Sequence, residues 1–208
     1  NVYDKEDDIT GCQDPGLMAY YNFDDNVNDL SGNNNNGVNN GAVFVSGVNG
    51  KALSFDGNMD EVSVADNSIL DLSGAMTIAA WVKLRVPDTD YSDQIIQKAS
   101  DINDAMIAWY YFGATSGEAG NTRPLATIGG SWGGAVGFYP VQNVWYHVAA
   151  TYDGTNFKSY KDSILTGTIN MSGGLATNNQ PLQIGRGWHG TIDGDIDEVK
   201  IYNYAKSY

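Results

Sequence analysis

The segment MTIAAWVKL at residues 76–84 shows the clearest structural pattern in the chain. Every second residue from Met76 onward is apolar, and the positions between them include Thr77, Trp81 and Lys83. A period of two is typical of a β-strand with one buried face and one face toward solvent. The segment therefore predicts a half-buried strand.

Short apolar or alternating runs of the same kind continue on both sides of this segment, with turn dipeptides such as Asp153-Gly154 between some of them. No stretch keeps a helical period over three turns, and only residues 66–71 and 204–206 admit a short helical turn. The pattern predicts an all-β protein built as a two-sheet antiparallel β-sandwich or jelly roll. The further predicted strands lie at residues 17–23, 41–45, 51–55, 60–65, 94–98, 105–112, 124–129, 135–139, 144–152, 156–161, 181–185 and 191–202.

The chain divides into a short entry segment and one domain. Residues 1–16 are acidic and aperiodic and contain Pro15-Gly16, which predicts a linker or an entry segment. Residues 17–208 contain no linker signal and are predicted to form a single domain. The chain starts without an initiator Met or a basic-then-apolar leader, as expected of a processed protein or a domain of a larger one.

Composition excludes several classes of function. Lys and Arg number 11 against 25 Asp and Glu, which gives a formal net charge of −14. Nucleic-acid binding is not expected, because it needs clustered cations, and no apolar run reaches the roughly 18 residues of a membrane-inserted helix. The 25 glycines, 13 tyrosines and 5 tryptophans favour tight turns and aromatic contacts with sugars. Cys12 is the single cysteine, so no internal disulfide can form.

Five segments, in order along the chain, resemble the laminin-G-like, concanavalin A-like jelly roll. They are residues 19–37, 50–65, 76–83, 145–154 and 192–204. The resemblance implies a fold that serves mostly in carbohydrate-binding modules, adhesins and receptor domains, often with a structural calcium ion. The same sandwich also occurs in glucanases and lyases, so the fold alone does not decide between binding and catalysis.

The loop at residues 24–37 is rich in oxygen donors of the kind that calcium prefers. The resemblance implies a calcium ion held between this loop and the last strand. Its implied ligands are the side chains of Asp24, Asp29, Asn36 and Asp197 and the carbonyl groups of Asn26 and Ser31. The alternative is an Asn-rich turn whose side chains cap its own backbone.

Aromatic residues beside planar polar groups indicate where a sugar would bind, because a ring covers the apolar face of a pyranose. Trp81, Trp145 and Tyr152 are expected to pack in the core instead. The candidate sugar-binding residues are Trp109 and Tyr111 on one strand, Trp132 and Trp188 between glycines, His189, and the scarce cations Arg123 and Arg186.

Catalytic motifs are incomplete in this sequence. Neither residues 193–198 nor residues 56–61 supply the first Glu of the Glu-x-Asp-x-x-Glu string of jelly-roll glucanases. His147 lies in a predicted core strand, and His189 has no partner string. The sequence therefore favours a non-catalytic carbohydrate-binding module with a structural calcium, secreted or at the cell surface, excised from a polysaccharide-active enzyme. It would bind a polysaccharide or oligosaccharide beside other domains of a larger chain. A surface adhesion or protein-interaction domain is the alternative, followed by a small lyase or glycoside hydrolase.

Overall fold

The computed structural model describes residues 14–85, 93–101, 103–111, 121–187 and 189–208. One turn of 3-10 helix, η2 (Ser68–Leu70), is the one helical element in these ranges. The strands in chain order are β1 (Leu17–Tyr21), β2 (Gly37–Asn40), β3 (Val43–Ser46), β4 (Lys51–Asp56), β5 (Glu61–Val64), β6 (Met76–Leu84), β7 (Asp93–Lys98), β8 (Ile107–Tyr111), β9 (Thr122–Ile128), β10 (Ser131–Gly134), β11 (Trp145–Tyr152), β12 (Asn156–Lys161), β13 (Ile164–Asn170), β14 (Leu182–Ile184) and β15 (Asp193–Tyr202).

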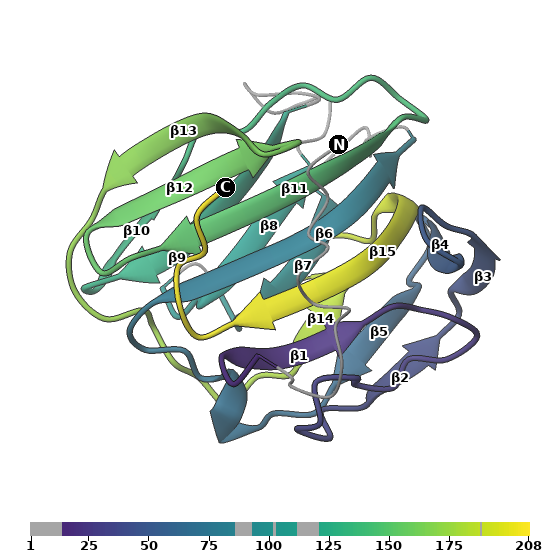
Figure 1. The fold of residues 1–208 in the computed structure, drawn as a ribbon, viewed down its shortest axis with the longest axis horizontal. Coiled ribbons are helices and arrows are strands. Elements are labelled where there is room, and N and C mark those ends of the chain that lie inside the picture. Colours follow the sequence, from purple (N-terminus) through teal and green to yellow (C-terminus); the bar gives the residue numbers. More distant parts are fainter. Residues whose placement is uncertain (1–13, 86–92, 102, 112–120, 188) are drawn as a thin grey trace.

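The strands form two antiparallel sheets packed face to face (Figure 1). Within the described residues, sheet A has eight strands in the order β13-β12-β11-β6-β15-β4-β3, and β1 pairs with β15 outside that path. Sheet B has seven strands in the order β10-β9-β8-β7-β14-β5-β2. The predicted all-β, two-sheet antiparallel sandwich is therefore confirmed.

The core lies between the sheets and follows the period of two read from β6. Met76, Val82 and Leu84 are fully buried in it, whereas Trp81 on the opposite face is only partly buried. Tyr152 is in the core, as expected. Trp81 and Trp145 are not, because both lie on the outer face of sheet A. Trp145 lies under the Lys83 ammonium there, with Nζ 5.0 Å from the ring centroid.

Strand β15 bends near its middle. Its register with β6 shifts between Asp197 and Lys200, and Glu198 has a positive φ of 53°. One extra residue in an antiparallel strand is a β-bulge, which bends the strand and re-aims its side chains. On its other edge, β15 pairs with β4 before the bulge and with β1 after it.

Most predicted strands are present, and the differences have local causes. Gly41, with φ of +99°, makes the turn that separates β2 from β3, so the strand predicted at 41–45 begins only at Val43, and β2 was not predicted. The strand predicted at 135–139 is wrong, because the chain pairs instead at β10 through Ser131–Gly134. Strand β13 was not predicted. The short turn predicted at 66–71 is η2.

A buried ammonium group ties three segments of the fold together. Lys98 has a fully buried side chain at the end of β7. Its Nζ lies 2.8 Å from Asp66 Oδ1 and 3.1 Å from Asp71 Oδ1, on either side of η2. It also donates to the carbonyl oxygens of Asn178 and Gln180, at 2.8 and 3.0 Å, in the connection to β14. These contacts replace the hydration of the charge, as a buried cation requires.

Two further expectations concern the ends of the chain and membranes. Residues 1–13 lie outside the described part, so the linker at 1–16 stays a prediction, as does the single domain at 17–208. Among the described residues, no helix has the length and apolar character needed to cross a membrane.

Candidate functional site

Sheet B positions most of the predicted sugar-binding residues that the structure describes. In β9, Ala126 and Ile128 face the core, so Arg123 and Thr127 point outward. Trp132 pairs with Thr127 across β10 and β9 and shares that outer face, with 55% of its surface exposed. Arg186 and His189 follow β14 in the same sheet.

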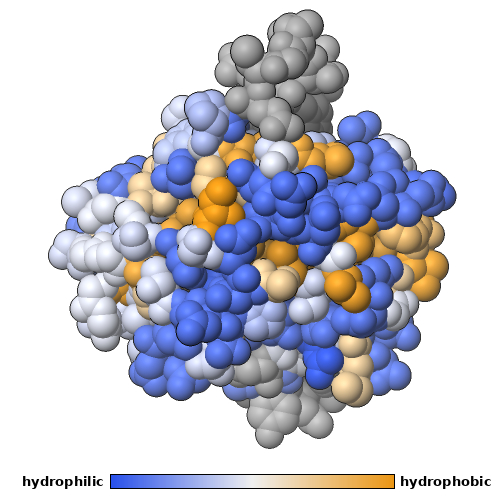
Figure 2. Space-filling view, turned by 90° about the horizontal axis from the view of Figure 1, so that it is seen from below, coloured by the Kyte–Doolittle hydropathy of each residue, from blue (hydrophilic) through white to orange (hydrophobic). Residues whose placement is uncertain are grey.

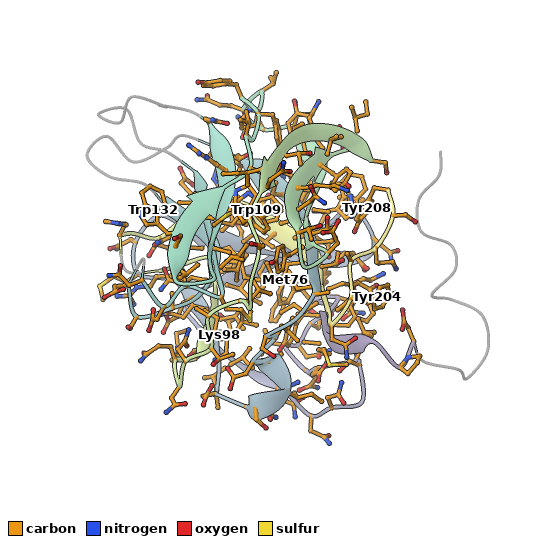
Figure 3. The ribbon with its side chains drawn as sticks, turned by 90° about the vertical axis from the view of Figure 1, so that its left-hand side faces the viewer. Met76, Lys98, Trp109, Trp132, Tyr204 and Tyr208 are labelled. Atoms are coloured by element: carbon orange, nitrogen blue, oxygen red, sulfur yellow. The ribbon has the colours of Figure 1, made fainter. Side chains whose placement is uncertain are left out.

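Three candidate residues do not contribute to a described surface. Trp109 is only 2% exposed and packs between the sheets, so the expectation that it forms an open platform is wrong (Figure 3). The side chain of Tyr111 and the whole of Trp188 lie outside the described residues.

A row of planar polar side chains crosses the outer face of sheet B, and we call Glu61, Gln183 and Gln97 the polar row. Gln183 lies between the core residues Leu182 and Ile184, and therefore points outward. Its Nε2 donates to Glu61 Oε2 at 2.9 Å, and Gln97 Nε2 donates to Gln183 Oε1 at 3.3 Å. Carboxylate and amide groups fixed in this way offer both donors and acceptors, with Gln97 buried beneath the two partly exposed members of the row.

Residues 186–187 and 189–191 fold back onto this row. Gly187 N donates to Gly190 O at 3.1 Å, and His189 N donates to Gln94 Oε1 at 3.1 Å. A Cβ on Gly187 would lie 2.2 Å from Gln94 Oε1 and 2.3 Å from Gln97 Oε1. The backbone at Gly187 therefore packs directly against these two side-chain oxygens, which holds Arg186 beside the polar row.

Arg186 and Gln94 supply polar groups that the described residues do not saturate. Arg186 Nη1 lies 4.0 Å from Glu61 Oε2, and its side chain is 32% exposed. Gln94 is fully buried, and its Nε2 has no hydrogen-bond partner among the described residues. A buried donor without a partner is costly, and it marks a place where a ligand or water would complete the structure.

The Asn-rich loop after β1 is organised by its own hydrogen bonds. Asp29 Oδ1 accepts from the N–H groups of Tyr20 and Ser31, at 3.0 and 2.9 Å. Asp29 Oδ2 accepts from Ser31 Oγ and from Asn35 N, both at 2.9 Å. Asn36 Oδ1 accepts from Asp29 N. These contacts occupy the four lone-pair sites of the Asp29 carboxylate.

Most of the predicted calcium ligands in this loop therefore cap the backbone of the loop itself, which is the alternative to a calcium site. Asn26 bonds within the loop too, because its Oδ1 accepts from Asn28 N. The loop lies at the lower end of the sandwich, which Figure 2 shows as a mostly hydrophilic surface with scattered hydrophobic areas. In the described parts of the chain, no three His, Cys, Asp or Glu side chains gather closely enough to hold a metal, so Asp29 does not join Asp24 and Asp197.

Asp24 and Asp197 instead meet at one tight turn, residues 47–50, between β3 and β4. Asp24 Oδ1 accepts from Lys51 N at 2.8 Å. Asp197 Oδ2 accepts from Val48 N at 2.8 Å and from Asn49 N at 3.2 Å. The bulge in β15 aims Asp197 at this turn, and its side chain is fully buried.

The two carboxylates pack closely against the glycines of the turn. A Cβ on Gly47 would lie 2.4 Å from Asp197 Oδ2, and one on Gly50 would lie 2.1 Å from Asp24 Oδ1. Asp197 Oδ1 is buried without a hydrogen-bond partner in the described residues. Burial raises the pKa of Asp197 to about 7, although the N–H groups of Asn49 and Val48 act in the opposite direction. Two carboxylates at one turn, one of them with a buried oxygen that has no partner in the described residues, fit a hard cation such as calcium.

Asp193 and Asp195, in one of the two acidic strings considered for catalysis, are held by basic side chains. Asp193 and Asp195 are held by Arg85, and Asp195 also pairs with Lys83 at 2.5 Å. Burial alone would raise the pKa of Asp195, but hydrogen bonds from Lys83, Ser54 and Arg85 together lower it. A general acid in glycoside hydrolysis needs a raised pKa, so this cluster does not match that role.

A family model described as the concanavalin A-like lectin/glucanases superfamily matches residues 56–208, which include the polar row, Arg186 and Asp197. The chain belongs to this superfamily. No curated protein sequence matches the chain.

Solved structures of low sequence identity share the fold. Domain 4 of AbnA, a GH43 extracellular arabinanase from Geobacillus stearothermophilus in complex with arabinotriose, has a TM-score of 0.74 at 23% identity, over 92% of this chain and 94% of that one. The binding domain of Paraclostridial Mosquitocidal Protein 1 has a TM-score of 0.75 at 18% identity, over 92% and 50%. A botulinum neurotoxin type C structure, described by its interaction with two ganglioside molecules, has a TM-score of 0.69 at 14% identity, over 92% and 49%.

The superfamily resemblance seen in the sequence is thus confirmed, but sequence reasoning missed part of the site. Glu61, Gln183, Gln97 and Gln94 were not among the candidates. Glu61 and Gln183 occupy the outward positions of their strands, so a period-two reading of each strand could have identified them. Their alignment in one row depends on the pairing of β5, β14 and β7, which no single segment encodes.

Proposed function

We propose that this chain is a non-catalytic glycan-binding module whose sugar site is the outer face of sheet B. The observation that carries the proposal is the polar row with Arg186 beside it, because it joins fixed acceptors to unsaturated donors. Sugar hydroxyl groups both donate and accept, so they suit such a surface. The arabinotriose complex of the arabinanase domain supports the proposal, since that domain shares the fold over nearly its whole length.

The two parts of the face are spaced for a chain of several sugars. Trp132 on β10 and Gln183 on β14 are separated by four strand-to-strand steps. At about 4.8 Å a step, this corresponds to about 19 Å. Leu125 and Ala108 lie on the same face between these two residues but are buried, so Trp132 and the polar row would contact the glycan at two separate points.

The proposed ligand is a neutral polysaccharide. The Arg186–Glu61 pair has no net charge, and the chain as a whole carries −14. A module of this kind would raise the effective concentration of an attached enzyme domain at its polymer. We therefore also propose a secreted or cell-surface location and a larger polysaccharide-active parent protein.

The proposed cofactor is one structural calcium ion at the turn 47–50. Asp24 and Asp197 would hold it together with carbonyl groups of the turn. The ion would neutralise two carboxylates and connect the first loop to the last strand. It would thereby stabilise the fold without taking part in sugar contact.

Replacing Arg186 or Trp132 by alanine tests the sugar site. Arg186→Ala should weaken binding of neutral oligosaccharides, such as arabinotriose, by about tenfold or more, since hydrogen bonds to charged groups contribute about 1.5–3 kcal/mol and tenfold is about 1.4 kcal/mol. Trp132→Ala should also weaken binding, because its exposed ring is the proposed contact with the apolar face of a sugar. The melting temperature should stay nearly constant, because exposed substitutions usually change stability by less than about 0.5 kcal/mol. Isothermal titration calorimetry and thermal melts measure both quantities.

Trp145→Ala is the matched control, because Trp145 is a partly exposed tryptophan on the outer face of sheet A. It should leave oligosaccharide binding unchanged. Equal losses from Trp145→Ala and Trp132→Ala would place the sugar site elsewhere. A protein-interaction domain of the same fold, the alternative function, would bind no oligosaccharide in either form.

A further inference from the structure

Strand β13 is an unusual edge for a soluble sheet. It runs for seven residues, Ile164–Asn170, at the end of sheet A. The edge strands β2, β3 and β10 have four residues each. The free side of β1 is covered, since Leu30 N donates to Tyr20 O and Tyr20 N donates to Asp29 Oδ1. Among the strands described, β13 is therefore the one long edge without a cover.

The backbone of β13 is open toward solvent. Its backbone ladder is with β12 alone, and no other backbone hydrogen bond involves Ile164–Asn170 in the described residues. An edge strand presents a row of free N–H and C=O groups that can pair with another strand. Figure 3 looks onto the side of the sandwich where this edge lies.

This edge exposes apolar side chains at its first two positions and carries none of the usual protection. Ile164 is 70% exposed and Leu165 is 52% exposed. Val136, which is 60% exposed, lies beside them, because its carbonyl accepts from Thr166 Oγ1 at 3.1 Å. Natural edge strands are commonly protected by charged side chains or proline, but residues 163–171 contain neither.

Charge distinguishes this edge from the rest of the molecule. Residues 163–185 contain no charged residue at all, in a chain with a net charge of −14. The charged residues that border the edge are ion-paired: Lys161 with Asp162 at 3.5 Å, and Lys158, opposite Thr168 on β12, with Asp153 at 3.8 Å. Two copies that meet here therefore avoid the mutual repulsion that their other acidic surfaces would cause.

We propose that β13 is a self-association edge, on which a second copy of this chain pairs its own β13 antiparallel across a two-fold axis. An isologous contact of this kind closes on itself and gives a dimer, the commonest symmetric assembly. Pairing satisfies the free backbone groups of both edges and covers Leu165 and Val136. Sheet A then continues from one copy into the other. The inference does not depend on the proposed glycan site, which lies on sheet B.

Analytical ultracentrifugation of the full chain over a range of concentrations tests this inference. The weight-average mass should rise toward twice that of the monomer. Leu165→Lys with Thr168→Lys should keep the mass at that of the monomer, because edge lysines prevent pairing. Both positions are exposed, so the fold should be retained. The matched control is Val43→Lys on β3, the opposite edge of sheet A, where Val43 is 62% exposed.

Three results would overturn the inference. The first is a wild-type weight-average mass equal to that of the monomer at every concentration, which would show that β13 does not pair with a second copy. The second is a dimer that Val43→Lys abolishes and the β13 variant does not. The third is open-ended growth beyond two copies, because a two-fold contact cannot propagate.

Discussion

Lys98→Met should lower the free energy of unfolding by about 3–5 kcal/mol, the usual cost of removing one member of a buried ion pair. The substitution keeps the length of the side chain but removes its charge and its donors. Asp66, Asp71 and the carbonyl groups of Asn178 and Gln180 would then face a methyl group. Chemical denaturation of the folded variant measures the loss.

Lys158→Met is the control for this result. Lys158 also pairs with a carboxylate, Asp153 at 3.8 Å, but both side chains are about one third exposed. Exposed pairs contribute about 0–1 kcal/mol. A Lys98 variant that is no less stable than the Lys158 variant would show that the ammonium does not hold these segments together.

Calcium should stabilise the chain by about 2.7 kcal/mol at a hundredfold excess over its dissociation constant, and a chelator should remove this gain. Asp197→Asn should lose most of the response, because Asp197 is the buried ligand that joins β15 to the turn 47–50. Thermal melts with calcium and with chelator measure the difference. Asp25→Asn is the matched control. It removes one carboxylate beside Asp24, but Asp25 is exposed and pairs with Lys51.

The stability of the calcium-free protein should depend on pH, and the pKa of Asp197 sets the direction of this dependence. The folded pKa of Asp197 is about 7, above the ordinary Asp value of about 3.9 in the unfolded chain. The folded state therefore binds the proton more tightly, and without calcium its stability falls as pH rises from about 4 through about 7. In chelator above pH 7, Asp197→Asn should be at least as stable as the wild type. In the presence of calcium, the wild type should be more stable than Asp197→Asn. If neither calcium nor chelator changes the melting temperature of the wild type, the calcium site is excluded.

Local pattern predicted the strands wherever one face is buried. The alternation in residues 76–84 gave the bounds of β6 and also showed that Trp81 faces away from the core. The expectation that Trp81 and Trp145 are buried followed residue type instead, and the outer face of sheet A accommodates both. Strand β13 was missed because Gly167 interrupts a run whose side chains are mostly outside the core, so no buried face marks it.

The candidate sites were predictable only in part, since they depend on pairing between distant segments. Asp24 and Asp197 were predicted from the family resemblance, and both reach the turn 47–50. Asp29 has the same residue type, but the hydrogen bonds of its own loop occupy it. Oxygen-rich composition cannot separate a ligand from a loop-organising residue, because both offer the same atoms.

A glycan array probed with the wild-type chain tests the central proposal most directly. We expect binding to neutral polysaccharides, with little binding to polyanionic glycans. The signal should fall for Arg186→Ala and persist for Trp145→Ala. An array on which the folded, calcium-loaded chain binds no glycan, or binds equally well after Arg186→Ala and Trp132→Ala are combined, would contradict the assignment of sheet B as a sugar-binding face.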